Sequence, residues 1–347
     1  MQEVVTVGLD LAKQVFQAHG ADAEGAPLFS RKLRRAEVLR FFEKLPRCMV
    51  GMEACSGAHY WAREISALGH DVRMIPPAYV APFVKRGKTD AGDAEAISEA
   101  VTRKTMRFVP IKTAEQQAAA MVLKTRSLLV RQRTQAVNAL RCHLTELGII
   151  AGAGIAKVDS LIAIVRDESD TRLPPAARFA MRAIADQIEA LKQQASKLED
   201  AIVREAKVDE DMRRLVTIPG VGAITAATIK ALVPDPGGFK SARHFAAWIG
   251  LTPKPRSSGG KERLGRISKM GNPDLRSLLV VGATSVLRYA DKNAKTMPWL
   301  TGIVARRPYK VAAVALANKM ARIVWAVLTR GGVYQRGNSL AAATVTA

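Results

Sequence analysis

The chain has 347 residues, of which 48% are hydrophobic and 24% are charged. These are ordinary values for a folded protein and exclude global disorder. Lys and Arg total 53 against 31 Asp and Glu, giving a formal net charge of +22. A positive excess of this size indicates an anionic partner, and the backbone of a nucleic acid is the usual one.

The cysteine and histidine patterns argue against a disulfide-bonded domain and against a zinc-binding domain. The three cysteines form no Cys-x-x-Cys pair, which argues against a disulfide framework. The five histidines show no i,i+4 pairing and do not cluster with cysteine, so we expect no zinc site.

No segment predicts export or membrane insertion. The first residues lack a basic region followed by an apolar one, so we expect no signal peptide. The most apolar late stretch, 311–328, contains Lys319 and Arg322, which would be costly in a bilayer. We therefore expect a cytoplasmic protein without a membrane partner, associated with the nucleoid if DNA is its ligand.

The first part of the chain predicts a mixed α/β domain. Short apolar runs favour strands and the segments between them favour helices. The expected strands are 4–10, 14–18, 27–30, 48–53 and 71–75, and the expected helices are 35–44 and 58–68. This alternation implies some parallel pairing.

Four acidic residues are candidates for a site at the functional edge of such a sheet. Asp10 and Glu53 each end an apolar run, and the carboxyl ends of strands form that edge. Asp90 and Asp93 lie three apart at a predicted helix start, on one face. Converging carboxylates repel unless cations neutralise them, and oxygen ligands suit Mg²⁺ or Mn²⁺. A pair of ions about 4 Å apart is the usual device for attack on a phosphodiester. Taken singly, each acid could instead form a turn or favour the start of a helix.

The positive charge is concentrated late in the chain. Basic and acidic residues number 16 and 13 in 1–110, 15 and 13 in 111–210, and 22 and 5 in 211–347. The last region is therefore the expected nucleic-acid-binding module. Aromatic residues are only 5% of the chain, which favours a duplex or structured nucleic acid over single strands bound by stacking.

The middle of the chain predicts two long helices, 113–147 and one that begins near 175. The second carries a seam with alternating spacings of three and four, which is a heptad pattern. Its members are Met181, Ile184, Ile188, Leu191, Ala195, Leu198 and Ile202. The seam can pair with the first helix or with another copy of the chain, and both alternatives are open at this point.

Pro219-Gly220-Val221-Gly222 predicts a hairpin between two helices. Its glycines let backbone N–H groups approach a phosphate, so Gly220 and Gly222 are candidate nucleic-acid-binding residues. The element is similar to a helix-hairpin-helix, which grips DNA without reading its sequence. A simple turn is the alternative.

Residues 251–272 predict a basic loop rich in Gly, Pro and Ser. Its candidate phosphate contacts are Lys254, Arg256, Lys261, Arg263, Arg266 and Lys269. It also holds Ser257 and Ser258 before two glycines, where a hydroxyl could act as a nucleophile among cations. A plain flexible loop is the alternative. The helices 272–289 and 307–329 are expected to close the fold.

Six segments, in this order, resemble bacterial insertion-sequence-110 transposases. They are VGLDLAKQVF, VGMEACSGAHYW, RGKTDAGDAEAI, TIPGVGAITAATI, HFAAWIGLTPKPRSSGGKERLGRISKMGN and RRPYKVAAVALANKMARIVWAVL. The last resembles the insertion-sequence-1111 branch. The family is related to Piv-type invertases, and its members are also called bridge-RNA-guided recombinases.

The resemblance implies more than the residues alone. It implies a RuvC-like (RNase H-type) domain over 1–110 whose Asp-Glu-Asp-Asp metal set falls on Asp10, Glu53, Asp90 and Asp93. It implies a helical, coiled-coil segment over 111–210 and a mostly helical transposase domain over 211–334, followed by a tail over 335–347. The family's serine nucleophile falls on Ser258. It also implies a homo-oligomer, dimer to tetramer, and a guide (bridge) RNA.

The expected function is therefore that of a DNA transposase, which recombines strands through a covalent phosphoserine. The rivals are a hydrolytic RuvC-like nuclease or Holliday-junction resolvase, a non-catalytic architectural binder, and a metal-dependent RNase.

Overall fold

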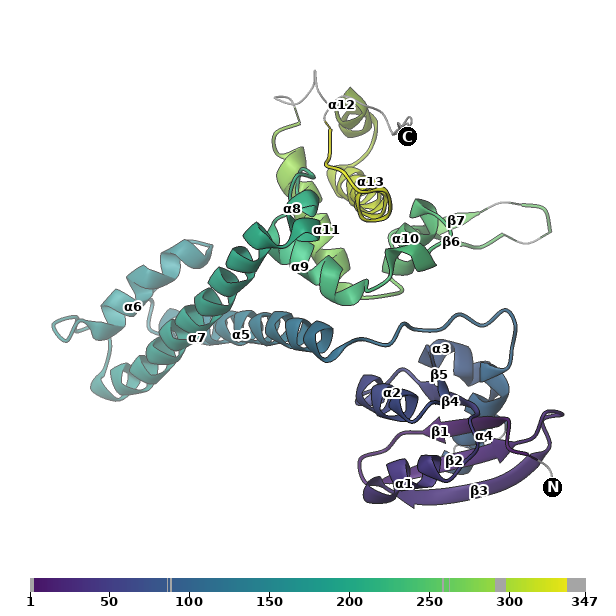
Figure 1. The fold of residues 1–347 in the computed structure, drawn as a ribbon. Helices are drawn as coiled ribbons and strands as arrows, with labels where there is room; N and C mark the ends of the chain where they lie inside the picture. Colours follow the sequence, from purple (N-terminus) through teal and green to yellow (C-terminus); the bar gives the residue numbers. More distant parts are fainter. Residues whose placement is uncertain are drawn as a thin grey trace. The chain divides into compact units, whose positions relative to one another are not determined.

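A computed structural model describes residues 3–85, 87, 89–257, 259–261, 263–290 and 298–335. The chain divides into two compact units, Met1–Gln117 and Ala118–Ala347 (Figure 1). Ser258 and most of the expected tail over 335–347 lie outside the described residues.

The N-terminal unit is built on a sheet whose described strands run in the order β3-β2-β1-β4-β5. Strand β1 pairs antiparallel with β2 and parallel with β4; β2–β3 is antiparallel and β4–β5 is parallel. The strands are β1 Thr6–Asp10, β2 Val15–Ala21, β3 Pro27–Arg34, β4 Met49–Glu53 and β5 Asp71–Ile75. The mixed α/β architecture predicted from the sequence is confirmed.

Helices cover both faces of this sheet. Helices α1 (Val38–Glu43) and α2 (Ala58–Ala67) contribute Phe42 and Trp61 to the larger core, where they join residues of β1, β2 and β4. Helix α4 (Asp90–Val101) packs on the other face, across β1, β2 and β4. Shorter segments connect these elements: η1 Arg35–Glu37, α3 Pro77–Val80 and η2 Ala81–Phe83.

Two long helices dominate the next part of the chain: α5 (Ala114–Thr145) and α7 (Pro175–Val208). They run antiparallel. Arg126, early in α5, forms an ion pair with Glu199, late in α7 (N···O 2.6 Å), while Leu144 of α5 shares a core with Met181 of α7.

The heptad seam of α7 is covered by other parts of the same chain. Met181, Ile188, Leu191, Ala195 and Ile202 are buried. The early seam positions pack with α5 and with α6 (Val158–Arg166), a helix that the sequence analysis did not predict and that follows η3 (Ile155–Lys157). Of the two pairings left open by the sequence, the structure describes the intramolecular one.

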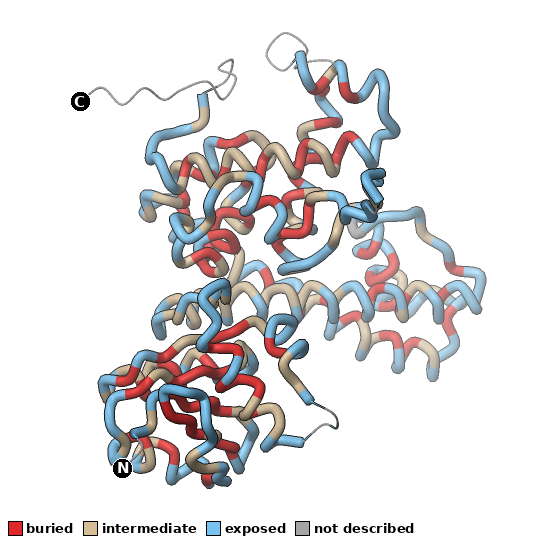
Figure 2. The backbone as a smooth tube through the Cα atoms, turned by 90° about the vertical axis from the view of Figure 1, so that its right-hand side faces the viewer, coloured by how far each residue is buried: buried red, intermediate tan, exposed pale blue. Residues whose placement is uncertain are grey.

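The rest of the C-terminal unit is largely helical. Its helices are α8 Glu210–Leu215, α9 Ala223–Leu232, η4 Pro236–Gly238, α10 Ala242–Ile249, α11 Pro273–Leu287, α12 Pro298–Arg306 and α13 Tyr309–Arg330. Helix α13 packs against α10 and α11, and one side of it is buried in their common core. Figure 2 shows that buried residues recur along the helices between intermediate and exposed ones. By length and composition α13 could cross a membrane; its apolar residues are instead used largely in this core.

The region 251–272 differs from the expected loop. Strands β6 (Pro253–Pro255) and β7 (Leu264–Ile267) pair antiparallel and form a two-stranded ribbon. The sequence did not predict these strands for two reasons. Its prolines and glycines are typical of loops, and a short ribbon without a buried face has no alternation of apolar and polar residues. Helix α12 was also not predicted.

Candidate functional site

Strand register brings the first two acids together. Asp10 is the last residue of β1 and Glu53 the last residue of β4. These strands are parallel neighbours, and Leu9 pairs with Met52, so the two acids follow at adjacent positions at the same end of the sheet. This is the edge at which parallel strands present their functional side chains.

Helix α4 supplies the other two acids in its first turn. The Thr89 hydroxyl accepts a hydrogen bond from the Gly92 N–H (3.1 Å), and this N-cap fixes the start of the helix at Asp90. Asp90 and Asp93 both lie in the first turn. The cap therefore determines where these carboxylates stand.

Two glycines allow α4 to lie close to the sheet. A β-carbon on Gly8 of β1 would lie 2.1 Å from the Ala94 carbonyl oxygen of α4. One on Gly51 of β4 would lie 2.8 Å from Cβ of Val101. Both contacts are shorter than real β-carbons tolerate, so only glycine permits this packing. Residues Asp10 and Glu53 lie two positions further along the same strands, on the same face as these glycines.

The electrostatics of Asp10 show that the four acids act on one another. The pKa of Asp10 is raised from 3.8 to about 6, first by burial and then by the negative charges of Asp93, Asp90 and Glu53; the backbone N–H of Leu11 opposes the shift. Asp10 thus carries unfavourable interactions that a cation would relieve.

The donor set fits a divalent cation by its chemistry. Carboxylate oxygens are the hard ligands that Mg²⁺ and Mn²⁺ prefer. Within the described residues, however, no three His, Cys, Asp or Glu side chains stand close enough together to hold an ion. The acids are gathered at one edge, and they are not closed around a common point.

A thiol missed by the sequence analysis lies beside these acids. Cys55 is exposed as a residue, but partial burial of its thiol, followed by the negative charges of Glu53 and Asp10, raises the pKa of that thiol above its ordinary value. Partial burial and negative neighbours both disfavour the thiolate, so neither activates this cysteine for attack.

A further acid of α4 is paired with a cation of the same unit. Glu95 of α4 forms an ion pair with Lys85 (2.6 Å).

In the C-terminal unit, the basic residues lie on or beside the β6–β7 ribbon. All six are exposed, and no ion pair in the described part of the chain includes any of them: Lys254, Arg256, Lys261, Arg263, Arg266 and Lys269. The ribbon is extended by the Arg256 N–H, which donates to the Arg263 carbonyl (2.8 Å). Unpaired cations on an exposed ribbon are suited to phosphate contacts.

The two adjacent serines differ in what the structure shows of them. Ser257 is described, and its hydroxyl accepts a hydrogen bond from the Arg263 N–H (3.1 Å), which ties it to the ribbon. The candidate nucleophile Ser258 lies outside the described residues. Placement of Ser258 therefore stays a prediction.

The hairpin between α8 and α9 has the expected helix–turn–helix order, but its two glycines have different surroundings. Gly220 has φ +86° and faces α11, where an added β-carbon would lie 2.7 Å from the Gly282 carbonyl oxygen. Gly222 is exposed and has open space where a side chain would stand. Packing thus explains Gly220, whereas Gly222 leaves the backbone at the start of α9 accessible.

Comparisons with known proteins give one consistent result. A family model described as "Transposase IS116/IS110/IS902 family" matches residues 212–297, and a transposase model of the DEDD type of IS110 matches residues 7–149. The chain is 46% identical to the "Probable family 20 transposase" of Pseudomonas aeruginosa, over 95% of this chain and 98% of that protein. It is 39% identical to the transposase of insertion sequence element IS1328 of Yersinia enterocolitica (97% and 100%) and 38% identical to that of IS1111A of Coxiella burnetii (97% and 93%).

Proposed function

Because this chain belongs to the IS110/IS1111 family of insertion-sequence transposases, which are DNA-processing enzymes with a DEDD domain, we propose that it cuts and rejoins DNA with four metal-binding carboxylates and one serine nucleophile. The carboxylates are Asp10, Glu53, Asp90 and Asp93, and the serine is Ser258. The observation that carries the proposal is the strand register that ends β1 and β4 side by side at two acids, with α4, whose first turn carries the other two, packed on both strands.

The acids hold the cofactor. A DEDD domain implies a divalent metal, and we propose Mg²⁺ or Mn²⁺ as the ion. Such an ion supplies charge stabilisation at a phosphate and lowers the pKa of an attacking hydroxyl. The work of the chain is to position oxygens from β1, β4 and α4 at one edge of the sheet.

The serine forms the covalent intermediate. The Ser258 oxygen attacks the phosphorus, a P–O(serine) bond forms, and the P–O(sugar) bond breaks. The serine proton ends on the departing sugar oxygen. Attack by a sugar hydroxyl of another strand reverses these changes, so strands are exchanged without an external energy source.

The basic residues of the C-terminal unit hold the DNA. The exposed cations of the ribbon, from Lys254 to Lys269, suit phosphate oxygens, and the accessible backbone near Gly222 adds N–H donors. We further propose that a guide RNA selects the target by base pairing and that a dimer or tetramer assembles the reacting strands.

The test is trapping of protein on a labelled DNA element end in the presence of Mg²⁺. Wild type should yield a protein–DNA adduct that survives denaturation, and Ser258→Ala and Asp10→Asn should each reduce it to background. Ser268→Ala is the matched control, since this serine lies just beyond β7 and its Oγ accepts a hydrogen bond from Met270 N–H. Strand cleavage that persists in a Ser257→Ala/Ser258→Ala double variant would instead identify a hydrolytic nuclease.

A further inference from the structure

The N-terminal unit carries a basic surface of its own. Residues 31–47 hold seven Lys and Arg against two Glu, although this unit as a whole carries little net charge. The basic side chains that lead this segment are exposed on or beside edge strand β3: Arg31, Lys32, Arg34 and Arg35.

These four side chains are used in two different ways. Arg31 lies over the ring of Phe41 (5.8 Å to the centroid) and Arg35 over that of Trp61 (5.0 Å), so both rest on the apolar side of the sheet. Lys32 and Arg34 make no ion pair with any carboxylate among the described residues. The last two therefore keep their charge available for an external ligand.

Sheet register places Lys32 in line with the acids. Asp10 of β1 pairs with Gln17 of β2, and Gln17 pairs with Lys32 of β3. Directly paired residues point to the same face, and neighbouring strands are about 4.8 Å apart, so the backbones at Asp10 and Lys32 are separated by about 10 Å. Arg34, two residues on, is on the same face and nearer the sheet end at which β1 terminates.

The residue between them keeps the acid and the cation apart. Gln17 is 5% exposed, and its Nε2 donates to the Ser30 hydroxyl (2.9 Å). This neutral amide fills the position between them, and Lys32 is exposed and forms no ion pair with Asp10. A negative site and a positive site thus stand side by side on one face.

We infer that Lys32 and Arg34 bind phosphates of the DNA strand whose scissile phosphate lies at the four acids. Stacked nucleotides rise about 3.4 Å each along the helix axis, so a separation of about 10 Å corresponds to at most about three nucleotides along that strand. The inference rests on the proposed function of the acids. Because the two sites are so near, the same strand contacts both of them. In the proposed function the strand at the acids is DNA, so we infer that the strand at Lys32 and Arg34 is DNA as well.

Charge on an edge strand has a second use, which is protection against pairing with another sheet. For such protection, a charged side chain at any position along the edge strand is sufficient. It does not account for unpaired cations that lie at the sheet end and on the sheet face that also carry Asp10.

The test measures DNA binding by the full-length protein without divalent metal, so that it does not depend on cleavage. Affinity for an element-end duplex is measured from 50 to 200 mM salt for Lys32→Gln/Arg34→Gln. The matched control is Arg40→Gln/Lys44→Gln, which removes the same charge from the exposed surface at α1. Loss of two phosphate contacts should lower the slope of log affinity against log salt by about 2 and weaken binding about tenfold at the lower salt.

The position is tested by neutral methylphosphonates placed one at a time along the strand. Wild type should lose affinity at one or two positions within about three nucleotides of the cleaved bond, and the Lys32/Arg34 variant should be insensitive there. An unchanged slope, an equal effect of the α1 control, or an effect on RNA alone would overturn the inference. The salt slope does not depend on whether Ser258 or the acids catalyse cleavage, so a failure of this inference can be told apart from a failure of the proposed function.

Discussion

Gly8 of β1 and Ala94 of α4 approach so closely that a β-carbon on Gly8 would lie 2.1 Å from the Ala94 carbonyl oxygen. This contact fixes the distance between the sheet and α4, and with it the position of Asp90 and Asp93 relative to Asp10. We therefore expect a mutation here to change the proposed catalytic site without replacing an acid.

Gly8→Ala is expected to reduce both stability and transposition. The β-carbon meets backbone atoms, which cannot rotate away, so α4 must move at a cost of about 1–3 kcal/mol in the free energy of unfolding. Gly51→Ala is the milder variant for comparison. Its β-carbon meets the side chains of Val101 and Ile97, which can adjust more easily than backbone atoms. Denaturant unfolding should rank Gly8→Ala as the more damaging. Equal and negligible effects would show that the helix is not held by this contact.

Asp10→Asn is expected to stabilise the metal-free protein at neutral pH while abolishing activity. The pKa of Asp10 is raised from 3.8 to about 6, so between these values the folded state binds more protons than the unfolded state. Stability contributed by this group is therefore present below about pH 4 and is lost as the pH rises through about 6.

The measurement is unfolding in EDTA at two pH values. At pH 7.5 the variant should exceed wild type by about 1 kcal/mol, a figure reduced because Asp10 is partly exposed and screened. At pH 4 the two should be equal. Added Mg²⁺ or Mn²⁺ should stabilise wild type more than Asp10→Asn, and the reverse order would argue against Asp10 as a metal ligand.

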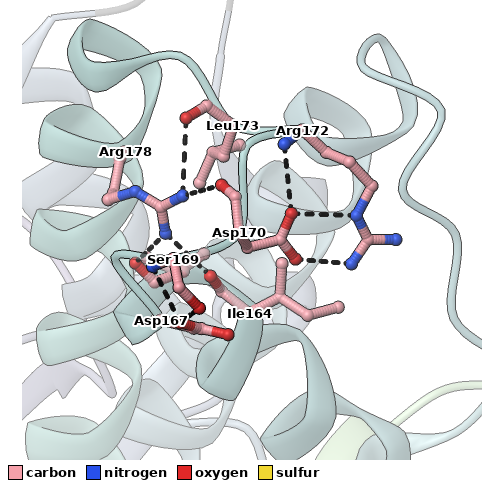
Figure 3. A network of polar contacts seen from close by, with 8 residues as sticks. Ile164, Asp167, Ser169, Asp170, Arg172, Leu173 and Arg178 are labelled. Atoms are coloured by element: carbon pink, nitrogen blue, oxygen red, sulfur yellow. Dashed lines mark hydrogen bonds and ion pairs between the residues drawn. The ribbon is translucent and has the colours of Figure 1, made fainter.

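Arg178→Leu is expected to destabilise the C-terminal unit by about 3 kcal/mol, because it leaves buried carbonyls without a donor. The Arg178 guanidinium donates to the carbonyls of Ile164 (2.9 Å), Val165 (3.1 Å), Leu173 (3.4 Å) and Asp170, closing the end of α6 onto α7 (Figure 3).

The control for this prediction is Arg182→Leu. Its ion pair with Glu168 (2.8 Å) is exposed at both side chains, so its loss should cost less than about 1 kcal/mol. Thermal unfolding of both variants checks the difference. Similar values for the two would refute the structural role assigned to Arg178.

Gly282→Ala is expected to push the α8–α9 hairpin away from α11. Its β-carbon would lie 2.0 Å from the Gly220 carbonyl oxygen, so we expect a loss of stability of about 1–3 kcal/mol together with weaker DNA binding. Gly302→Ala is the matched helical control, since nothing lies within 4 Å of its added carbon. That variant should be neutral or slightly stabilising in thermal unfolding.

Much of the N-terminal unit was predictable because its signals are local. Apolar runs that end in Asp10 and Glu53 predict strands with carboxylates at their ends, and Thr89 before Asp90 is typical of a helix start. The seam of α7 was likewise visible as a heptad pattern. Each of these features depends on residues within a few positions of one another.

Other features depend on contacts between distant segments, and only the tertiary structure decided them. The sequence left open whether the α7 seam pairs within the chain, and it gave no sign of α6, α12 or the β6–β7 ribbon. It also offered no reason for Gly8 to be glycine. Its neighbour Ala94 is 86 positions away along the chain.

The alignment of Asp10, Gln17 and Lys32 across three strands is another feature that only the tertiary structure decided. A shift of one residue in strand register would turn Lys32 to the other face and remove it from the acids. Residue types and local periodicity therefore determined which groups this protein has available. Strand register and helix–sheet packing, which are set by the burial of side chains far apart in the sequence, decided which of those groups stand together.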